Sequence, residues 1–380
     1  MIMLSGGLDS TVLAHEYRNQ DCCFVDYGQP SIREEQAAAC AVARELGRKL
    51  TQMVLPPLKV TNTDSNYYHG RNAMLAIAAS SLGDDEVVFG FSASDQEAYM
   101  DCRPEWIESM NQVLTAYGKS HVVAPYVNLS KAEVVRRGMA LGVDLTSTYT
   151  CYRSEGPCGE CAACHTRTLS MMEVKPPSLM IHSIWDTLQG EGAEVGRAAT
   201  FIRLQGCTVG CSWCDTKDSW QAGHPKQTMT IPEVVQRLTH SMVVITGGEP
   251  AQLDPTTMLM LVTAIRATGR IVDIESSGQG GGLDLVWKLA RVTLSPKKHL
   301  PPPSTDDLQR AHVLKLVVSG KEDLDWVLRL AQSRDGLGKV TYVQPVWGRR
   351  AAVEAATWMC MKEPHRLRLS LQTHKYAGLR

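Results

Sequence analysis

Seven of the twelve cysteines of this chain fall into two tight clusters, and their spacing constrains the fold more than any other feature. The first cluster has the pattern C-x6-C-x2-C-x2-C and the second has C-x3-C-x2-C. Thiolates two or three residues apart are typical of metal sites. The sequence therefore predicts two metal centres, one on each of two sets of ligands: Cys151, Cys158, Cys161, Cys164, and then Cys207, Cys211, Cys214.

Length and composition indicate a globular protein with two domains. The 380 residues suffice for two domains of roughly 100–200 residues each. Hydrophobic residues make up 44% and charged residues 21%, which excludes a disordered chain, a collagen and a coiled coil. No apolar run reaches the roughly 18 residues of a membrane helix. No basic segment followed by a cleavable apolar segment opens the sequence, so we expect a cytoplasmic protein with no membrane partner. The net charge of −1 argues against direct nucleic-acid binding.

Short β-branched runs alternate with helical patterns in both halves, which predicts parallel βαβ units. In the first half the predicted strands are Met1–Leu4, Cys22–Tyr27, Leu50–Leu55, Glu86–Phe91 and Val122–Ala124. The predicted helices of this half are Ser10–Asn19, Ser31–Leu46, Arg71–Leu82 and Pro104–Tyr117. In the second half the predicted strands are Ala199–Leu204, Met242–Thr246, Ile271–Glu275, Val292–Ser295, Val313–Val318, Thr341–Gln344 and Leu367–Leu371. The predicted helices of this half are Ile231–His240, Thr256–Thr268, Asp284–Leu289 and Leu324–Ser333.

The turn Lys175-Pro176-Pro177-Ser178 separates the two halves, because two prolines end any helix and make a stiff connector. We expect domains over 1–174 and 179–380, joined by a linker over 175–178. The second half is predicted to form a parallel sheet or an open barrel.

The segment Ser5-Gly6-Gly7-Leu8-Asp9-Ser10 lies between a predicted strand and a predicted helix. Its glycines let the backbone approach a phosphate, and the helix N-terminus offers free N–H groups to the anion. It lacks the Gly-Lys-Ser/Thr ending of a Walker A loop. The pattern resembles the pyrophosphate loop of ATP pyrophosphatases; a purely structural strand–helix turn is the alternative.

Further motifs resemble 7-cyano-7-deazaguanine synthase over essentially all of residues 1–170. They are Val25-Asp26-Tyr27-Gly28-Gln29, Gly70-Arg71-Asn72, Asp101-Cys102-Arg103, Asn128-Leu129-Ser130-Lys131-Ala132-Glu133 and the segment from Thr150 to Cys164. The resemblance implies an ATP-pyrophosphatase-like domain that converts 7-carboxy-7-deazaguanine to the nitrile through an amide. The implied ATP-binding residues are Ser5, Gly6, Gly7, Asp9, Ser10 and Arg71, with catalytic roles for Asp9, Ser10 and Lys131.

The four-cysteine cluster is predicted to hold zinc in a structural site, because four thiolates close a tetrahedral shell and leave no position for substrate. The resemblance implies zinc as well. The sequence departs from the family at Met100, where proline is expected, and in a shorter gap between Cys151 and Cys158. Three alternatives remain open for this domain: a reaction that stops at the amide, ligation of the carboxylate to another amine, and a non-catalytic scaffold.

The three-cysteine cluster predicts a 4Fe-4S cluster with one open iron, to which S-adenosylmethionine binds before reductive cleavage to a radical. Zinc is the alternative, but it needs a fourth ligand, and His182 and His224 are unfavourably spaced. Thr246-Gly247-Gly248-Glu249-Pro250 follows a predicted strand and resembles the GGEP motif of radical enzymes.

Residues 180–380 resemble 7-carboxy-7-deazaguanine synthase. The segments that carry the resemblance are Thr187–Gly192, Thr200–Gly206, Cys214–Lys217, Glu275–Gly278, Ser295–Lys297, Gln344-Pro345 and Ser370–Lys375. The resemblance implies a partial α/β barrel of the radical S-adenosylmethionine type and ring contraction of 6-carboxy-5,6,7,8-tetrahydropterin with loss of ammonia. The implied S-adenosylmethionine-binding residues are Gly247, Gly248, Glu249, Ser277, Ser295 and Lys297.

The same resemblance places magnesium beside Thr216, bridging to the substrate carboxylate, which is a donor set that suits a hard cation. Arg203 is predicted to contact the substrate, with a surface salt bridge as the alternative. Glu191 is predicted to bind the amidine edge of the pterin as a two-oxygen acceptor, with a turn or cap carboxylate as the alternative.

Together the halves predict a bifunctional enzyme that uses ATP, S-adenosylmethionine, a 4Fe-4S cluster, zinc and magnesium. Its partners are expected to be small pterin and deazapurine substrates, an electron donor such as flavodoxin or ferredoxin, and a second copy in a homodimer. The product of the second half is the substrate of the first, and the ammonia released by one step is consumed by the other. Joining them raises the effective concentration of both intermediates; channelling is a hypothesis at this point.

Overall fold

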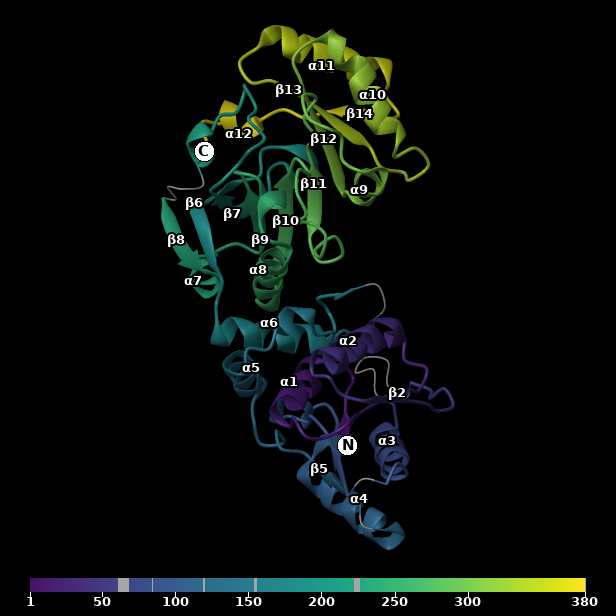
Figure 1. Cartoon of the computed structure of the whole chain (residues 1–380). Helices are drawn as coiled ribbons and strands as arrows, with labels where there is room; N and C mark the ends of the chain where they lie inside the picture. Colours follow the sequence, from purple (N-terminus) through teal and green to yellow (C-terminus); the bar gives the residue numbers. More distant parts are fainter. Residues whose placement is uncertain (61–67, 84, 119, 154–155, 222–225, 380) are drawn as a thin grey trace. The chain divides into compact units, whose positions relative to one another are not determined.

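The chain divides into two compact units, Met1–Lys175 and Pro176–Arg380, in a computed structural model that describes residues 1–60, 68–83, 85–118, 120–153, 156–221 and 226–379 (Figure 1). Each unit has its own sheet. The division lies at the turn over 175–178, where the first strand of the second unit begins at Ser178. None of the helices in the described ranges has the length and apolar character of a membrane span.

The sheet of the first unit contains five parallel strands in the order β3-β2-β1-β4-β5 (Figure 1). The strands are β1 (Ile2–Met3), β2 (Cys22–Asp26), β3 (Leu50–Val54), β4 (Glu86–Val88) and β5 (His121–Val123). The helices are α1 (Leu8–Glu16), α2 (Ile32–Glu45), α3 (Arg71–Ser80), α4 (Pro104–Tyr117), α5 (Lys131–Ala140) and α6 (Ala162–Val174). The strand order reverses between β1 and β4. In open parallel sheets, ligands bind at the carboxyl ends of the strands beside such a switch point.

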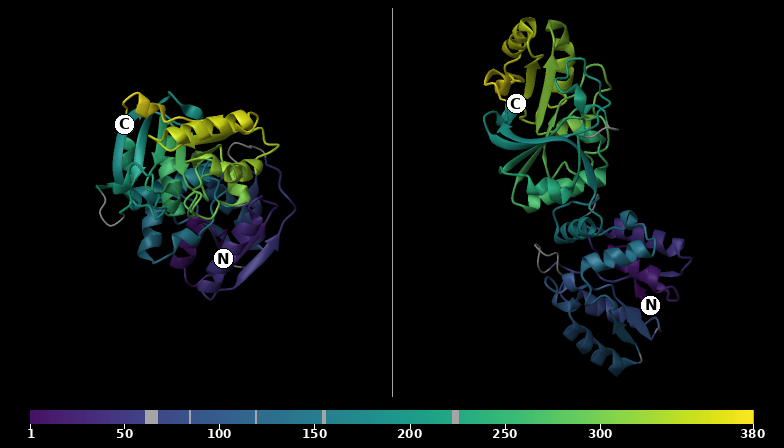
Figure 2. Two further views of the ribbon diagram at one scale, coloured as in Figure 1. Left: turned by 90° about the horizontal axis from the view of Figure 1, so that it is seen from above. Right: turned by 90° about the vertical axis from the view of Figure 1, so that its left-hand side faces the viewer.

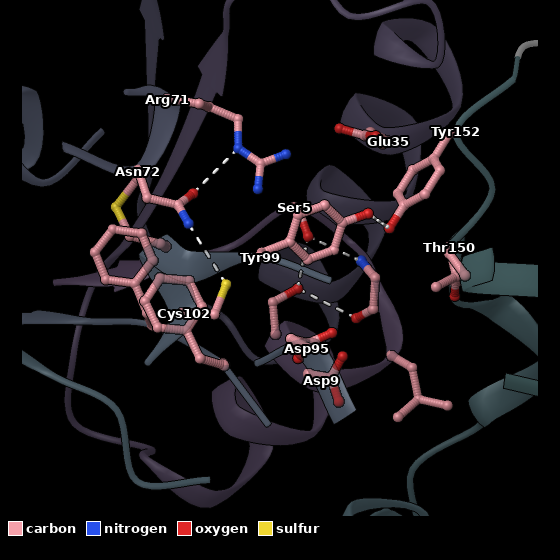
Figure 3. Close-up of a pocket in the computed structure, with 18 of the residues that line it drawn as sticks. Ser5, Asp9, Glu35, Arg71, Asn72, Asp95, Tyr99, Cys102, Thr150 and Tyr152 are labelled. Atoms are coloured by element: carbon pink, nitrogen blue, oxygen red, sulfur yellow. Dashed lines mark hydrogen bonds between the residues drawn. The ribbon is translucent and has the colours of Figure 1, made fainter. Parts of the chain in front are cut away.

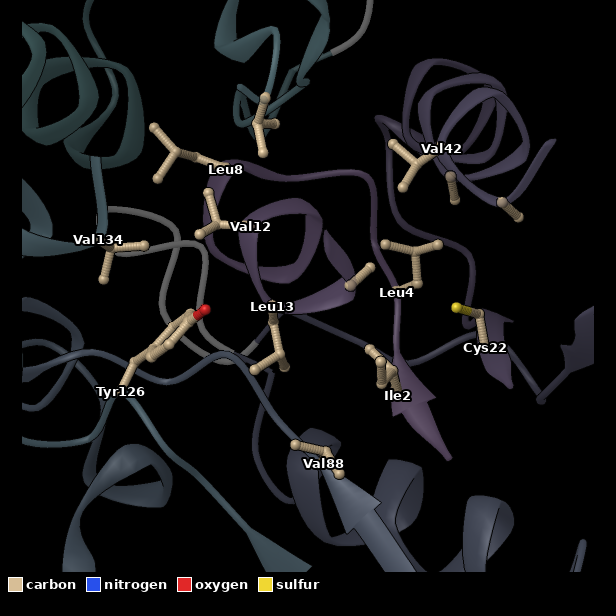
Figure 4. Close-up of a cluster of buried hydrophobic side chains, with 14 of the residues drawn as sticks. Ile2, Leu4, Leu8, Val12, Leu13, Cys22, Val42, Val88, Tyr126 and Val134 are labelled. Atoms are coloured by element: carbon tan, nitrogen blue, oxygen red, sulfur yellow. The ribbon is translucent and has the colours of Figure 1, made fainter. Parts of the chain in front are cut away.

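Alternating side chains of β1 serve two separate cores, one on each face of the sheet. Ile2 and Leu4 pack with residues of α1, α2 and α5 (Figure 4). Met1 and Met3 pack with residues of α3 and α4. Because successive residues of a strand point to opposite faces, a continuous apolar strand indicates a sheet covered by helices on both sides.

The sheet of the second unit has nine strands in the order β14-β13-β12-β11-β10-β9-β7-β6-β8. The strands are β6 (Ser178–Leu188), β7 (Ala198–Leu204), β8 (Gln227–Thr230), β9 (Met242–Thr246), β10 (Ile271–Ser276), β11 (Arg291–Leu294), β12 (Val313–Val318), β13 (Thr341–Pro345) and β14 (Leu367–Leu369). The helices are α7 (Ile231–Gln236), α8 (Pro255–Ala267), α9 (Thr305–Arg310), α10 (Leu324–Gln332), α11 (Arg350–Lys362) and α12 (Thr373–Tyr376). The strands from β14 to β7 are parallel, and the end strands β14 and β8 are not neighbours. The predicted open α/β sheet is therefore confirmed; Figure 2 shows the ribbon from two further sides.

Three local expectations were wrong. Strands β6 and β8 were not predicted, and β6 is antiparallel to both β7 and β8, so the sheet is not parallel throughout. The predicted helix Asp284–Leu289 consists of turns whose bonds join residues three apart, such as Val286 N–H to Leu283 C=O. Helices α5, α6, α9, α11 and α12 were missed. Strand β6 mixes polar and apolar residues and buries them irregularly, so it lacks the alternation that marks a half-buried strand.

We predict that Leu13→Ala destabilises the first unit by about 2–5 kcal/mol, because it removes a fully buried side chain and leaves a cavity. The free energy of opening is measured by hydrogen exchange at the amides of β1 and β2. Leu82→Ala is the matched control, since Leu82 is 39% exposed. Equal effects of the two substitutions would contradict the assignment of this core.

Candidate functional sites

The first unit has a cavity of about 420 Å³ at the carboxyl ends of β1 and β4, beside the switch point. All but one of the residues predicted from the sequence for this half, metal ligands apart, line it: Ser5, Gly7, Asp9, Ser10, Arg71 and Lys131. The exception is Gly6, whose role is in the backbone of the loop. The fold therefore brings one pocket together from segments that lie far apart in the sequence.

The loop between β1 and α1 is held tightly against helix α2. Gly6 has φ +75°, and a Cβ at this position would lie 2.7 Å from the backbone nitrogen of Ala39. Ser10 Oγ donates to the Gly7 carbonyl at 3.1 Å and lies 3.1 Å from Ser5 Oγ. Only glycine fits this close approach with a left-handed backbone. The tight packing leaves the loop facing the pocket.

Lys131, at the start of α5, is buried between two carboxylates. Its Nζ lies 2.7 Å from Asp9 and 3.4 Å from Asp95. Burial alone would lower the pKa of Lys131, but the two carboxylates outweigh it and raise the pKa. The ammonium is therefore neutralised within the site and fixes the position of Asp9. Figure 3 shows Asp9 and Asp95 next to each other.

Asp95 was missed by the sequence analysis. Its carboxylate also accepts from the Ser92 backbone N–H at 2.8 Å and from the Ser92 hydroxyl at 2.7 Å. The signal was present as Ser92-x-x-Asp95, a capping box without a long helix behind it.

Arg71 and Asn72 lie on another side of the pocket (Figure 3). Arg71 Nε donates to Asn72 Oδ1 at 3.1 Å, and the guanidinium stands 5.9 Å from the centre of the Tyr27 ring. Burial raises the pKa of Tyr27 to about 12. The hydroxyls of Tyr99 and Tyr152 are 2.7 Å apart. Aromatic walls with a few fixed polar groups suit a flat heterocycle.

The ligand atoms of Cys151, Cys158, Cys161 and Cys164 all lie within 4.8 Å of one another. Backbone N–H groups point at the sulfurs, for example Cys158 N–H to Cys151 Sγ at 3.3 Å and Cys161 N–H to Cys158 Sγ at 3.3 Å. The four side chains therefore fit a single metal ion whose coordination shell is filled by four sulfurs. Cys161 also caps the N-terminus of α6.

The second unit has a cavity of about 420 Å³ at the carboxyl ends of β7 and β9–β13. Predicted residues that line it are Arg203, Cys207, Cys211, Cys214, Gly247, Gly248, Glu249, Ser277, Ser295 and Lys297. The three cysteines line one cavity together, as the predicted cluster requires.

The Gly247-Gly248-Glu249 segment packs against the backbone that precedes the three cysteines. A Cβ at Gly248 would collide with the Gly206 carbonyl, and Glu249 N–H donates to that carbonyl at 2.9 Å. Glu249 is buried and accepts from the backbone N–H groups of Ala251 and Ser277, each at 2.9 Å. The acid is therefore locked in one orientation at the end of β9.

Glu191 does not line this cavity itself but lies next to two residues that do. Its carboxylate is paired with Lys315 Nζ and accepts from Gln372 Nε2 at 2.7 Å. Burial alone would raise the pKa of Glu191, but Lys315 and Gln372 hold it well below its usual range. Lys315 also lies 4.0 Å from Glu275. The sequence analysis missed Lys315, although a lysine within the apolar run Val313–Val318 was a signal of a buried charge.

Thr216 also lies outside the cavity lining, next to Asp215, which lines it. Thr216 Oγ1 donates to Asp215 Oδ1 at 3.1 Å, and Lys375 donates to Asp215 Oδ2 at 2.6 Å. His182, considered above as a fourth zinc ligand, does not line the cavity and bonds to Asp218 at 2.9 Å. His224 lies outside the described residues.

Known proteins resemble each part of this chain. The family model described as "Queuosine biosynthesis protein QueC" matches residues 1–175. The model described as "4Fe-4S single cluster domain" matches residues 188–278, which include all three cysteines of the second cavity.

This chain matches two curated relatives over most of their length. The 7-carboxy-7-deazaguanine synthase of Synechocystis sp. is 38% identical, over 55% of this chain and 97% of the relative. The 7-cyano-7-deazaguanine synthase of Nitrosomonas eutropha is 35% identical, over 44% of this chain and 90% of the relative. Among solved structures, QueE from Escherichia coli matches 54% of this chain and 97% of its own, at 27% identity and a TM-score of 0.44.

We predict that Lys315→Met reverses the pH dependence of stability that Glu191 contributes to the second unit. In the unchanged protein the pKa of Glu191 is lower in the folded state than in the unfolded state. Ionised Glu191 therefore stabilises the fold at pH values above the ordinary pKa of a glutamate, and this stability is lost as the pH falls. Without Lys315, burial raises the pKa of Glu191, so the free energy of unfolding falls as the pH rises. The loss at pH 8 should be about 3–5 kcal/mol, the cost of an unpaired buried charge.

The measurement is denaturant unfolding of both proteins between pH 3 and pH 8, a range that extends below the ordinary pKa of a glutamate. Lys288→Met is the matched control, since Lys288 is exposed. Parallel stability curves for Lys315→Met and the unchanged protein would show that Glu191 does not depend on Lys315.

Proposed function

The chain belongs to the 7-cyano-7-deazaguanine synthase family through one part and to the 7-carboxy-7-deazaguanine synthase family through the other, and we propose that it catalyses two consecutive steps of 7-deazaguanine biosynthesis. In the first step, the second unit contracts the ring of 6-carboxy-5,6,7,8-tetrahydropterin and releases ammonia. In the second step, the first unit uses ATP and ammonia to convert 7-carboxy-7-deazaguanine, through the amide, to 7-cyano-7-deazaguanine.

One observation carries the proposal: each unit gathers a separate set of chemical groups in its own pocket. The pocket of the second unit holds three cysteines beside the locked acid Glu249. The pocket of the first unit holds the glycine loop and the buried Lys131. Neither set could carry out the chemistry expected of the other. Two activities on one chain account for both.

In the second unit, a 4Fe-4S cluster on three thiolates would bind S-adenosylmethionine and supply its reductive cleavage to a hydrogen-abstracting radical, with an electron from a flavodoxin or ferredoxin. Glu249 and Ser277 give this pocket a fixed acceptor and a fixed hydroxyl for the polar end of S-adenosylmethionine. Arg203 lines the same cavity, with its guanidinium 5.3 Å from the centre of the Trp185 ring, and would pair with a substrate carboxylate.

Two residues of the second unit are proposed to act at the edge of the cavity. Glu191 would accept from the amidine edge of the pterin, and Lys315 keeps it ionised for that purpose. Thr216 would be a ligand of magnesium together with the substrate carboxylate. Asp215, hydrogen bonded to Thr216, adds a hard anionic oxygen of the kind that magnesium prefers.

In the first unit, the loop Ser5–Ser10 would bind the phosphates of ATP, and Ser10 would donate to them from the start of α1. Lys131 holds Asp9 in place beside the loop. The four-cysteine group is proposed to hold zinc as a structural ion, since a closed set of four thiolates offers no position to substrate. The two steps share both the carboxylate intermediate and ammonia, so one chain keeps both at higher effective concentration.

The proposal is tested by anaerobic turnover of the reduced protein. With 6-carboxytetrahydropterin, S-adenosylmethionine, magnesium, ATP and ammonium, we expect a product with the mass of 7-cyano-7-deazaguanine. Without ATP, the reaction should stop at 7-carboxy-7-deazaguanine. The mass of the amide in the complete mixture would show that the first unit stops one step earlier. No carboxylate product in the absence of ATP would refute the role of the second unit.

A reciprocal pair of variants tests whether the two sites are independent. Cys211→Ala removes one of three cluster ligands and should abolish ring contraction, while ATP-dependent conversion of supplied 7-carboxy-7-deazaguanine continues. Ser10→Ala removes a hydroxyl from the loop and should make the carboxylate accumulate while ring contraction continues. Product masses from each substrate are the measurement. Loss of both reactions in either variant, with the protein still folded, would contradict the two-site assignment.

A further inference from the structure

Arg167, on α6, lines the pocket of the first unit but has no role in the mechanism described so far. One of its terminal nitrogens donates to Thr150 Oγ1 at 2.8 Å and to Thr148 Oγ1, and the other donates to the Leu145 carbonyl. All three partners are neutral. In the described part of the chain, no carboxylate lies within ion-pair distance of this guanidinium.

The other basic groups of this pocket differ from Arg167 in their surroundings. The ammonium of Lys131 is already neutralised by Asp9 and Asp95. Arg71, on α3, also has a neutral partner, Asn72, but it lies on another side of the pocket. A triphosphate carries about four negative charges, so a loop that relies on backbone N–H groups and a neutralised lysine leaves most of that charge unbalanced. The positive charge of Arg167 is available to balance it.

Arg167 also lies on the loop side of the pocket. Its partner Thr150 follows Tyr149, whose backbone N–H donates to the Gly6 carbonyl at 2.9 Å. A Cβ at Gly7 would stand 3.5 Å from the Tyr149 carbonyl. The segment that holds Arg167 therefore packs directly on the phosphate loop. Burial lowers the pKa of Arg167, and the charges of Cys164, Asp9 and Asp144 oppose this effect in part.

The four-cysteine group explains how the arginine is held there. Cys161 caps α6, and Cys164 and Arg167 are three residues apart, so they lie on the same face of the helix one turn from each other. A metal ion bound by all four cysteines would fix the first turn of α6 and with it the direction of Arg167. The cysteine group would then serve the pocket without contacting a ligand.

We propose that Arg167 is a further catalytic residue of the first unit, which binds the β- and γ-phosphates of ATP and stabilises the pyrophosphate that leaves. This inference rests on the proposed ATP-dependent function. In that step a carboxylate oxygen of the substrate attacks the α-phosphorus, and the bond from this phosphorus to the oxygen bridging to the β-phosphorus breaks. Pyrophosphate leaves with the electron pair. Its growing charge is met by a planar guanidinium, which can donate two parallel hydrogen bonds.

The test measures binding of two probes, inorganic pyrophosphate with magnesium and adenosine, to the full chain by calorimetry. Arg167→Gln should weaken pyrophosphate binding by about tenfold to a hundredfold, the loss expected for charge-assisted hydrogen bonds. Adenosine binding should be unchanged, since adenosine carries no phosphate. Arg167→Lys should restore part of the pyrophosphate affinity, because lysine keeps the positive charge but cannot donate two parallel hydrogen bonds.

Arg136→Gln is the matched control, because it makes the same charge change at an exposed arginine paired with Glu173 of α6. The inference is overturned if pyrophosphate affinity is unchanged in Arg167→Gln, or if both probes lose affinity equally, which would indicate structural support only. If Arg167→Gln does not fold, pyrophosphate affinity in Arg167→Lys decides the question: an unchanged affinity overturns the inference, and a partial loss supports it.

The inference and the proposed function fail in different ways. If the unchanged protein releases no pyrophosphate from ATP when 7-carboxy-7-deazaguanine is supplied, the proposed function of the first unit fails. If it does release pyrophosphate and Arg167→Gln releases it at the same rate, only the role of Arg167 fails.

Discussion

Parallel strand pairing is the constraint on which both sites depend. In each unit it brings the carboxyl ends of several strands to one edge of the sheet, and a pocket opens there. In the first unit the order reverses between β1 and β4, so the loops after these strands separate and leave room for a ligand. In the second unit the pocket extends along β7 and β9–β13 because the sheet stays open. The chemistry of each site is then set by the residues that follow the strands.

Both pockets contain a buried lysine that faces two carboxylates. Lys131 lies between Asp9 and Asp95, and Lys315 is paired with Glu191 and lies near Glu275. Removing such charges from water costs several kcal/mol each, and only a well-placed opposite charge offsets that cost. The lysines therefore fix their acids in position, and Lys315 holds the pKa of Glu191 well below its usual range. Because each lysine faces two carboxylates, it has no positive charge left for an anionic ligand, so further positive charge has to come from elsewhere, as proposed for Arg167 in the first unit.

The two cysteine groups differ in how they relate to the pockets. The four-cysteine group draws one loop and the start of α6 together, and its effect on the pocket would pass through the helix that it caps. The three cysteines of the second unit line the pocket themselves, next to Gly248, which touches the backbone of Gly206. The number of thiolates therefore separates a supporting site from a reacting one.

The sequence by itself determined the α/β class, both cysteine groups and most of the residues to which a role in the two pockets is assigned. Spacing and glycine turns are local, so they can be read along the chain. Asp95, Lys315 and Arg167 were found only in the tertiary structure, because their roles depend on partners far away in the sequence. Lys315 meets Glu191 across 124 residues, and Lys131 meets Asp9 across 122. The antiparallel strand β6 was also decided there, because its irregular burial reflects the neighbours β7 and β8 rather than its own pattern. Charge pairing and strand direction are set by which segments meet in the folded chain, and a linear sequence does not display those contacts.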